Sequence, residues 1–165
     1  MMNPRSRLWA SILLSAIATP VVVAGFYQVF GASSAELVSL SVIFYAFCMG
    51  TVFLLLTLHD LIHSAPSPFK GLFILSATTF FLSIVAALES LQKTPALYLF
   101  LAMAVLFFLT TMKSRSLWLK YPTGFGRKTL WHELSRIENA WVVLYVCAFF
   151  LFIFLAGHYL GWIPA

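Results

Sequence analysis

Apolar residues dominate five long stretches of the chain, and short polar segments separate them. The stretches run over residues 8–30, 37–58, 71–91, 95–112 and 140–163, and each holds 18 to 24 residues. An α-helix rises about 1.5 Å per residue, so these lengths match the hydrocarbon core of a bilayer, which is about 30 Å thick. The alternation of polar and apolar residues that is typical of a membrane β-barrel is absent. The pattern predicts five transmembrane helices.

Composition supports an integral membrane protein and leaves little of the chain for a soluble domain. Of the 165 residues, 62% are hydrophobic and 9% are charged, and the mean hydropathy is +0.97. Soluble domains carry about 25% charged residues. We therefore expect one all-α, multi-pass membrane domain over residues 1–165, in which the five helices pack as a bundle.

The first apolar stretch has two interpretations. Arg5 and Arg7 precede it, and Ala16 and Ala18 resemble the small residues at which a signal peptide is cleaved. However, the apolar stretch continues to Phe30, which makes it long enough to span a membrane. We expect an uncleaved first helix. Cleavage would leave four helices in the same orientation.

The connections between the stretches are short and carry helix-start signals. Ser67 precedes Pro68 and Thr94 precedes Pro95, and a capping residue before a proline is a preferred helix start. Residues 92–94 alone join the third and fourth stretches. Because this connection is so short, these two helices are expected to be antiparallel neighbours.

Positive charge is concentrated on one side of the predicted membrane. When the helices cross alternately, nine of the ten Lys and Arg residues fall on one side, and Lys93 alone falls on the other. Cytoplasmic loops carry this excess, so we expect a cytoplasmic N-terminus and an external C-terminus. Compactness and short loops favour a bacterial inner membrane. The net charge of +5 indicates contact with anionic headgroups rather than nucleic acid, because no nucleic-acid motif accompanies it.

The longest connection, residues 113–139, is basic and lies on the predicted cytoplasmic side. It mixes cations with aromatic residues, as segments at the membrane interface do. Thr129 is expected to cap an amphipathic juxtamembrane helix that leads into the last span. One face of this helix would carry Leu130, Leu134, Ile137 and Trp141. The connection therefore offers a surface for headgroups or for a partner protein.

The strongest candidate for a chemical site is the segment HDLIH, at the cytoplasmic end of the second stretch. If the helix continues that far, His59 and His63 lie one turn apart, the spacing with which a helix offers two nitrogens to a metal. The segment resembles the HExxH motif of zinc metalloproteases, with the shorter Asp60 at the position of the general-base Glu. With His132 and Glu133, predicted on the same face, these residues form a candidate site for a divalent metal such as zinc. The alternative is that they simply end a helix at the headgroup level.

Few strongly polar groups lie inside the predicted spans. Glu89 is the only carboxylate within a predicted boundary, and it lies near the outer end, four residues before Lys93. We expect these two to form a surface pair, with a proton or substrate site at Glu89 as the alternative. Ser11, Ser15 and Thr19 form a stripe of small residues that favours close helix packing.

Three functions remain open at the level of sequence. The first, which we expect, is a non-enzymatic subunit or accessory protein of a membrane complex that acts through helix packing and the basic connection. The second is a metal-binding membrane enzyme or metal handler built on the His/Asp cluster. The third is a small transporter or channel. Neither a GxSG segment nor an HxxHH box is present, which argues against intramembrane serine proteases and di-iron hydroxylases.

Overall fold

The computed structural model describes residues 4–30, 34–63, 67–121 and 134–161, and within these ranges it is helical, with no strand. The helices are α1 (Pro4–Phe30), α2 (Ser34–His63), α3 (Pro68–Glu89), α4 (Thr94–Lys120) and α6 (Arg136–Leu160). All five are long and apolar enough to cross a membrane. The expectation of an all-α chain with five helices that could span a membrane is therefore confirmed for the described residues.

Several helices extend beyond the apolar stretches that predict them. α4 continues eight residues past Met112, α2 continues five residues past Leu58, and α6 begins four residues before Ala140. Polar residues end an apolar stretch without ending a helix, because Lys, Arg and Ser are tolerated in helices and their backbone hydrogen bonds continue. The predicted spans are therefore the apolar middles of longer helices.

The amphipathic helix expected before the last span does not run continuously into α6. α6 starts at its own N-cap, Ser135, whose backbone is extended (φ −64°, ψ 159°) and whose hydroxyl accepts a hydrogen bond from the Glu138 N–H. Leu134 is 7% exposed and Ile137 is 70% exposed, so the prediction that they share one apolar face is wrong. The rest of the expected helix falls in residues 122–133, outside the described part of the chain.

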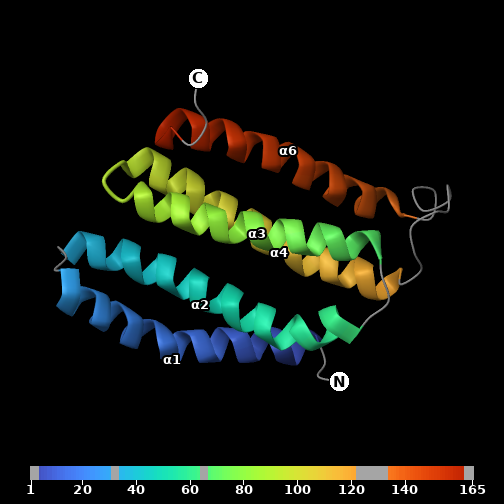
Figure 1. Ribbon diagram of the computed structural model, residues 1–165, viewed down its shortest axis with the longest axis horizontal. Coiled ribbons are helices and arrows are strands. Elements are labelled where there is room, and N and C mark those ends of the chain that lie inside the picture. The colour runs from blue at the N-terminus through green and yellow to red at the C-terminus, as the bar shows by residue number, and fades with distance from the viewer. Residues whose placement is uncertain (1–3, 31–33, 64–66, 122–133, 162–165) are drawn as a thin grey trace.

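The helices form three groups side by side (Figure 1). α3 and α4 are an antiparallel hairpin in the middle, as predicted, and they make the most extensive contact in the molecule. α6 packs against one side of this hairpin, touching both of its helices, and α2 packs against the other side. α1 packs mainly on α2. The α3–α4 hairpin is therefore the centre of the molecule. Together with α6 it is called the α3–α4–α6 unit, and the α1–α2 hairpin lies on its other side.

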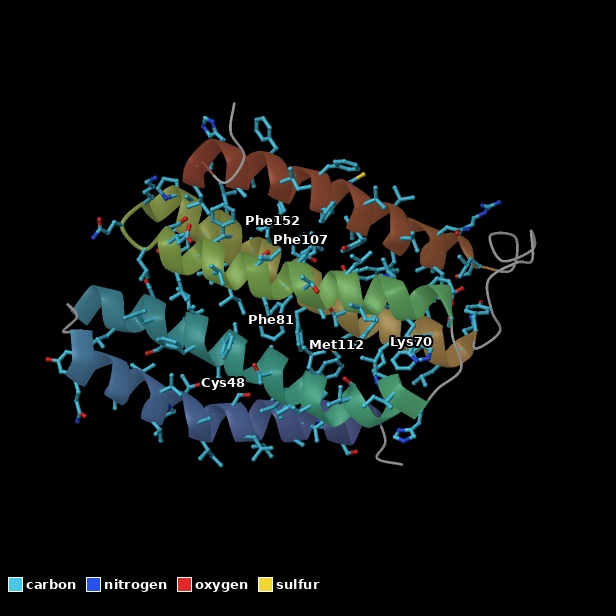
Figure 2. All side chains as sticks on the ribbon, in the orientation of Figure 1. Cys48, Lys70, Phe81, Phe107, Met112 and Phe152 are labelled. Atoms are coloured by element: carbon cyan, nitrogen blue, oxygen red, sulfur yellow. The ribbon has the colours of Figure 1, made fainter. Side chains whose placement is uncertain are left out.

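Aromatic side chains fill the interior of the α3–α4–α6 unit. Phe107 of α4 meets Tyr145 and Phe152 of α6, with ring centroids 6.0 and 5.9 Å apart, and Figure 2 shows Phe107 and Phe152 between the two helices. Phe73 of α3 packs on Trp118 of α4 with centroids 5.7 Å apart. The two contacts of Phe107 are edge-to-face, and contacts of this kind give aromatic pairs a defined geometry in addition to buried area. Aromatic contacts thus join α4 to both α3 and α6.

α2 approaches this unit closely at a glycine. The ring of Phe80, on α3, lies against Gly50, and a Cβ added to Gly50 would be 2.8 Å from the Phe80 Cζ atom. Nearby, Phe53 of α2 meets Phe108 of α4 with centroids 5.6 Å apart. Because Gly50 has no side chain, α2 can place its backbone beside the Phe80 ring.

The predicted small-residue stripe of α1 is buried. Ser11 and Ser15 are fully buried and Thr19 is 7% exposed, whereas Pro20 beside them is exposed. Their hydroxyls are satisfied within α1: Ser11 donates to the Leu8 carbonyl at 2.8 Å and Thr19 donates to the Ser15 carbonyl at 2.7 Å. This stripe lets α1 pack closely on α2 without leaving an unpaired hydroxyl.

Candidate functional site

The carboxylate of Glu138, in the first turn of α6, accepts three hydrogen bonds. Lys120 donates to its Oε1 at 2.8 Å, and the Tyr121 hydroxyl donates to its Oε2 at 3.0 Å. The backbone N–H of Ser135 also donates to Oε2, at 2.9 Å. Glu138 is 5% exposed, and a buried carboxylate needs such donors because it has lost water.

The same group completes the N-terminus of α6. The Ser135 hydroxyl accepts from the Glu138 N–H at 3.2 Å, while the Glu138 carboxylate accepts from the Ser135 N–H. This reciprocal arrangement is a capping box, which satisfies two of the backbone donors that a helix start leaves without intrahelical partners. Glu138 therefore fixes where α6 begins as well as what it contacts.

The start of α3 joins the same cluster. Ser67 is the N-cap of α3 with Pro68 behind it, as predicted, but its hydroxyl makes no capping bond. It donates instead to the Tyr121 carbonyl at 3.0 Å, and the Phe69 and Tyr121 rings lie 6.0 Å apart. The start of α3, the end of α4 and the start of α6 thus meet in one place. We call this the Glu138 junction; its residues are Ser67, Lys120, Tyr121, Ser135 and Glu138.

The junction also brings together the two flanks of the segment 122–133. Tyr121 precedes this segment, Leu134 and Ser135 follow it, and both flanks are bonded to Glu138. The segment contains the adjacent cations Arg127 and Lys128. The described residues on both sides of this segment are therefore bonded to the same carboxylate.

Further cations lie at the same end of the bundle as the junction. The Lys70 ammonium lies 5.6 Å from the centroid of the buried Trp118 ring, a cation–π arrangement, and Figure 2 shows it at this end of the bundle. Arg115 is only 6% exposed and Arg136 is exposed. We call this end of the bundle, where α3 and α6 begin and α4 ends, the Glu138 end. The described cations there are Lys70, Lys113, Arg115, Lys120 and Arg136.

The opposite end, called the Lys93 end, is held by its own lysine. Lys93, in the turn between α3 and α4, donates to the Tyr159 carbonyl in the last turn of α6 at 2.9 Å. Lys93 is also the N-cap of α4, a role that the sequence assigned to Thr94. Glu89, its expected partner, is exposed at the end of α3. Because the last carbonyls of a helix lack intrahelical donors, Lys93 stabilises the end of α6.

The candidate metal site lies only partly within the described residues. α2 remains helical through His63, so His59 and His63 are one turn apart on one helix, and His63 is exposed. The side chains of His59 and Asp60, and all of His132 and Glu133, lie outside the described part of the chain. Among the described residues, no three His, Cys, Asp or Glu side chains come together in a metal-binding group. The metal site stays a prediction.

Sequence reasoning missed the Glu138 junction, although part of its signal is readable. Ser135 and Glu138 have the S-x-x-E spacing of a capping box. The bonds from Lys120, Tyr121 and Ser67 have no such local signal, because Ser67 and Tyr121 are 54 residues apart.

No known family explains the junction. The chain matches no family model, and no curated protein or solved structure shows significant similarity to it. The functional argument therefore rests on the residues of this chain.

Proposed function

We propose that this protein is a non-enzymatic subunit or accessory protein of a membrane complex. It contacts its partner through helix packing and through the basic connection 113–139, of which the segment 122–133 with Arg127 and Lys128 is the central part. The observation that carries the proposal is the Glu138 junction, which bonds the residues that flank that segment, Tyr121 and Ser135, to Glu138. Fixing the ends of a segment lowers the conformational entropy lost when it binds. A basic segment held in this way is suited to an acidic surface on a partner or to anionic headgroups.

We further propose that the Glu138 end faces the cytoplasm and that the membrane is a bacterial inner membrane. The described cations gather at this end, and Lys93, the exception, has a structural role at the end of α6. A lysine that caps a helix need not obey the charge rule that orients loops. Lys93 therefore does not weaken the charge argument for a cytoplasmic Glu138 end.

The test of the accessory role is purification from native membranes in a mild detergent, followed by measurement of native size. We expect the protein to migrate with a second membrane protein at constant stoichiometry. Arg127→Glu should weaken that association at least about tenfold, which corresponds to about 1.4 kcal/mol. Arg136→Glu is the matched control, because it reverses one charge at the same end but outside the segment. An acid in the first turn also suits the helix dipole.

A wild-type protein that purifies alone, as a single chain in detergent, contradicts the proposal. So does an association that Arg127→Glu and Arg136→Glu weaken equally, because that result assigns the effect to general charge. The segment would then have no specific role.

A second candidate is the metal-binding enzyme or metal handler, and one observation favours it. The helical backbone of α2 through His63 gives His59 and His63 the spacing that metal ligation from one helix requires. Metal analysis of detergent-purified protein tests this directly. Stoichiometric zinc that is lost in the His59→Ala/His63→Ala double variant would favour the metal protein over the accessory protein. A metal-free wild type would remove this candidate.

A further inference from the structure

A small apolar cavity lies between α2 and the α3–α4 hairpin. Its volume is about 130 Å³. The lining residues are Val42, Ala46 and Met49 of α2, Phe80 of α3, and Leu101, Ala104, Val105, Phe108 and Leu109 of α4. None of these side chains carries a hydrogen-bonding N–H or O–H group. The cavity lies beside the Gly50–Phe80 contact, at the boundary between the α1–α2 hairpin and the α3–α4–α6 unit.

The cavity has a buried floor and an exposed mouth. Phe80, Ala104 and Phe108 are 3%, 2% and 8% exposed and form the floor. Val42 and Val105 are 51% and 61% exposed and mark the opening. These residues lie within helices that are long and apolar enough to span a membrane, so the cavity opens sideways, towards hydrocarbon.

A second hollow adjoins the first across α2. It is an open groove of about 470 Å³ between α1 and α2, at the level of Pro20. Val42 lines both hollows. Ser41 and Tyr45 face the groove, whereas Ala46 and Met49 face the cavity, so the two hollows meet over the surface of α2.

We propose that the cavity is a binding site for one acyl chain of a membrane lipid, with the α1–α2 groove as its continuation. An apolar cavity of about 150 Å³ without polar partners stays dry and takes up apolar molecules of about the size of benzene. At this depth the molecules that reach the mouth are lipid chains. The bound chain would fill the space that the side chains of α2 and α4 leave open beside the Phe53–Phe108 contact. The site is independent of the proposed partner complex.

The test uses purified protein in vesicles of phosphatidylcholine that carries a diazirine in the middle of one acyl chain. After photolysis, labelled residues are mapped by mass spectrometry. Phe108 and Phe107 are adjacent and both buried, but only Phe108 lines the cavity. We expect Phe108 to be labelled at least about fivefold more than Phe107, towards the level of Phe150, which is 65% exposed. Equal, background labelling of Phe107 and Phe108 overturns the proposal.

A cavity-filling variant gives an independent arm. Ala104→Leu adds three carbons to the floor and should reduce the labelling of Phe108 to that of Phe107. Ala102→Leu makes the same change on the exposed side of α4 and should leave it unchanged. Unaltered Phe108 labelling in folded Ala104→Leu overturns the proposal. If Ala104→Leu does not fold, Ala46→Leu fills the cavity from α2, with the same expectation and the same contrary result. The labelling is measured on purified protein without a partner. Its outcome therefore does not depend on whether the protein migrates with a second membrane protein in the purification experiment.

Discussion

At the scale of single residues, Glu138 joins the start of α6 to the end of α4. Its carboxylate serves α6 as half of a capping box and receives donors from Lys120 and Tyr121 on α4. Since Lys120 is 57% exposed, the ion pair itself is screened and contributes little. The stabilisation comes mainly from the cap and from the hydrogen bonds to a buried acceptor.

Removal of that acceptor is expected to loosen the junction. Glu138→Ala should lower the free energy of unfolding by about 1–2 kcal/mol, because it removes the carboxylate half of the capping box and leaves the Ser135 N–H without its acceptor. Unfolding in mixed detergent micelles measures the change. Glu138→Gln keeps an acceptor oxygen and should lose less. Equal stability of wild type and Glu138→Ala would show that the junction does not stabilise the fold.

Gly50 is the second residue whose side chain, here a single hydrogen, determines how closely two helices pack. Gly50→Ala places a methyl group against the buried Phe80 ring, and overpacking of this kind costs about 1–3 kcal/mol. The gain in helix propensity, about 1 kcal/mol, offsets only part of that cost. We expect a net loss of stability in the same unfolding assay.

Gly25→Ala is the matched control for Gly50. No atom lies within 4 Å of a Cβ added at Gly25, so only the propensity gain applies and stability should stay equal or rise. If both variants behave alike, the close approach of α2 to Phe80 does not limit the packing.

At the scale of helices, α6 is attached to the α3–α4 hairpin by a lysine at each end. Lys120 reaches Glu138 in its first turn, and Lys93 reaches the Tyr159 carbonyl in its last turn. Lys93→Met should therefore fray the end of α6 and raise amide hydrogen exchange at Gly161 several-fold, with little effect at Tyr145. Lys113→Met, a lysine outside both contacts, is the control. Unchanged exchange at Gly161 in Lys93→Met would mean that Gly161, in its left-handed conformation, ends the helix unaided.

The sequence predicted the helices well because of a constraint that a bilayer imposes. Backbone groups in hydrocarbon must bond within the segment, so apolar length alone indicates a helix. The same argument says nothing about polar ends, and the extension of α4 to Lys120 was missed for that reason. The start of α6 was misplaced because apolar periodicity outweighed the Ser135–Glu138 capping box. Contacts such as Ser67 to Tyr121 are tertiary and had no local signal.

At the scale of the whole molecule, the two ends of the bundle differ in charge, and this asymmetry gives the last prediction. Gln92 is exposed at the Lys93 end and Arg136 is exposed at the Glu138 end. The test starts from a variant in which the two free cysteines, Cys48 and Cys147, are replaced by alanine. Gln92→Cys or Arg136→Cys is then introduced, one at a time. A membrane-impermeant maleimide should label the cysteine at 92 in intact cells, and the cysteine at 136 only after permeabilisation.

The opposite labelling pattern would place the cations outside, against the rule that positive loops stay in the cytoplasm. It would also put the basic segment 122–133 out of reach of a cytoplasmic partner. The result would therefore contradict both the proposed orientation and the proposed role of this segment in binding a partner. A further variant separates the charge of Lys93 from its position. Because Lys93 acts as a cap, Lys93→Met should leave both labelling patterns unchanged while loosening α6. The orientation of the protein in the membrane would then depend on the cations of the Glu138 end. The single lysine at the other end, Lys93, would be explained by its hydrogen bond to the last turn of α6.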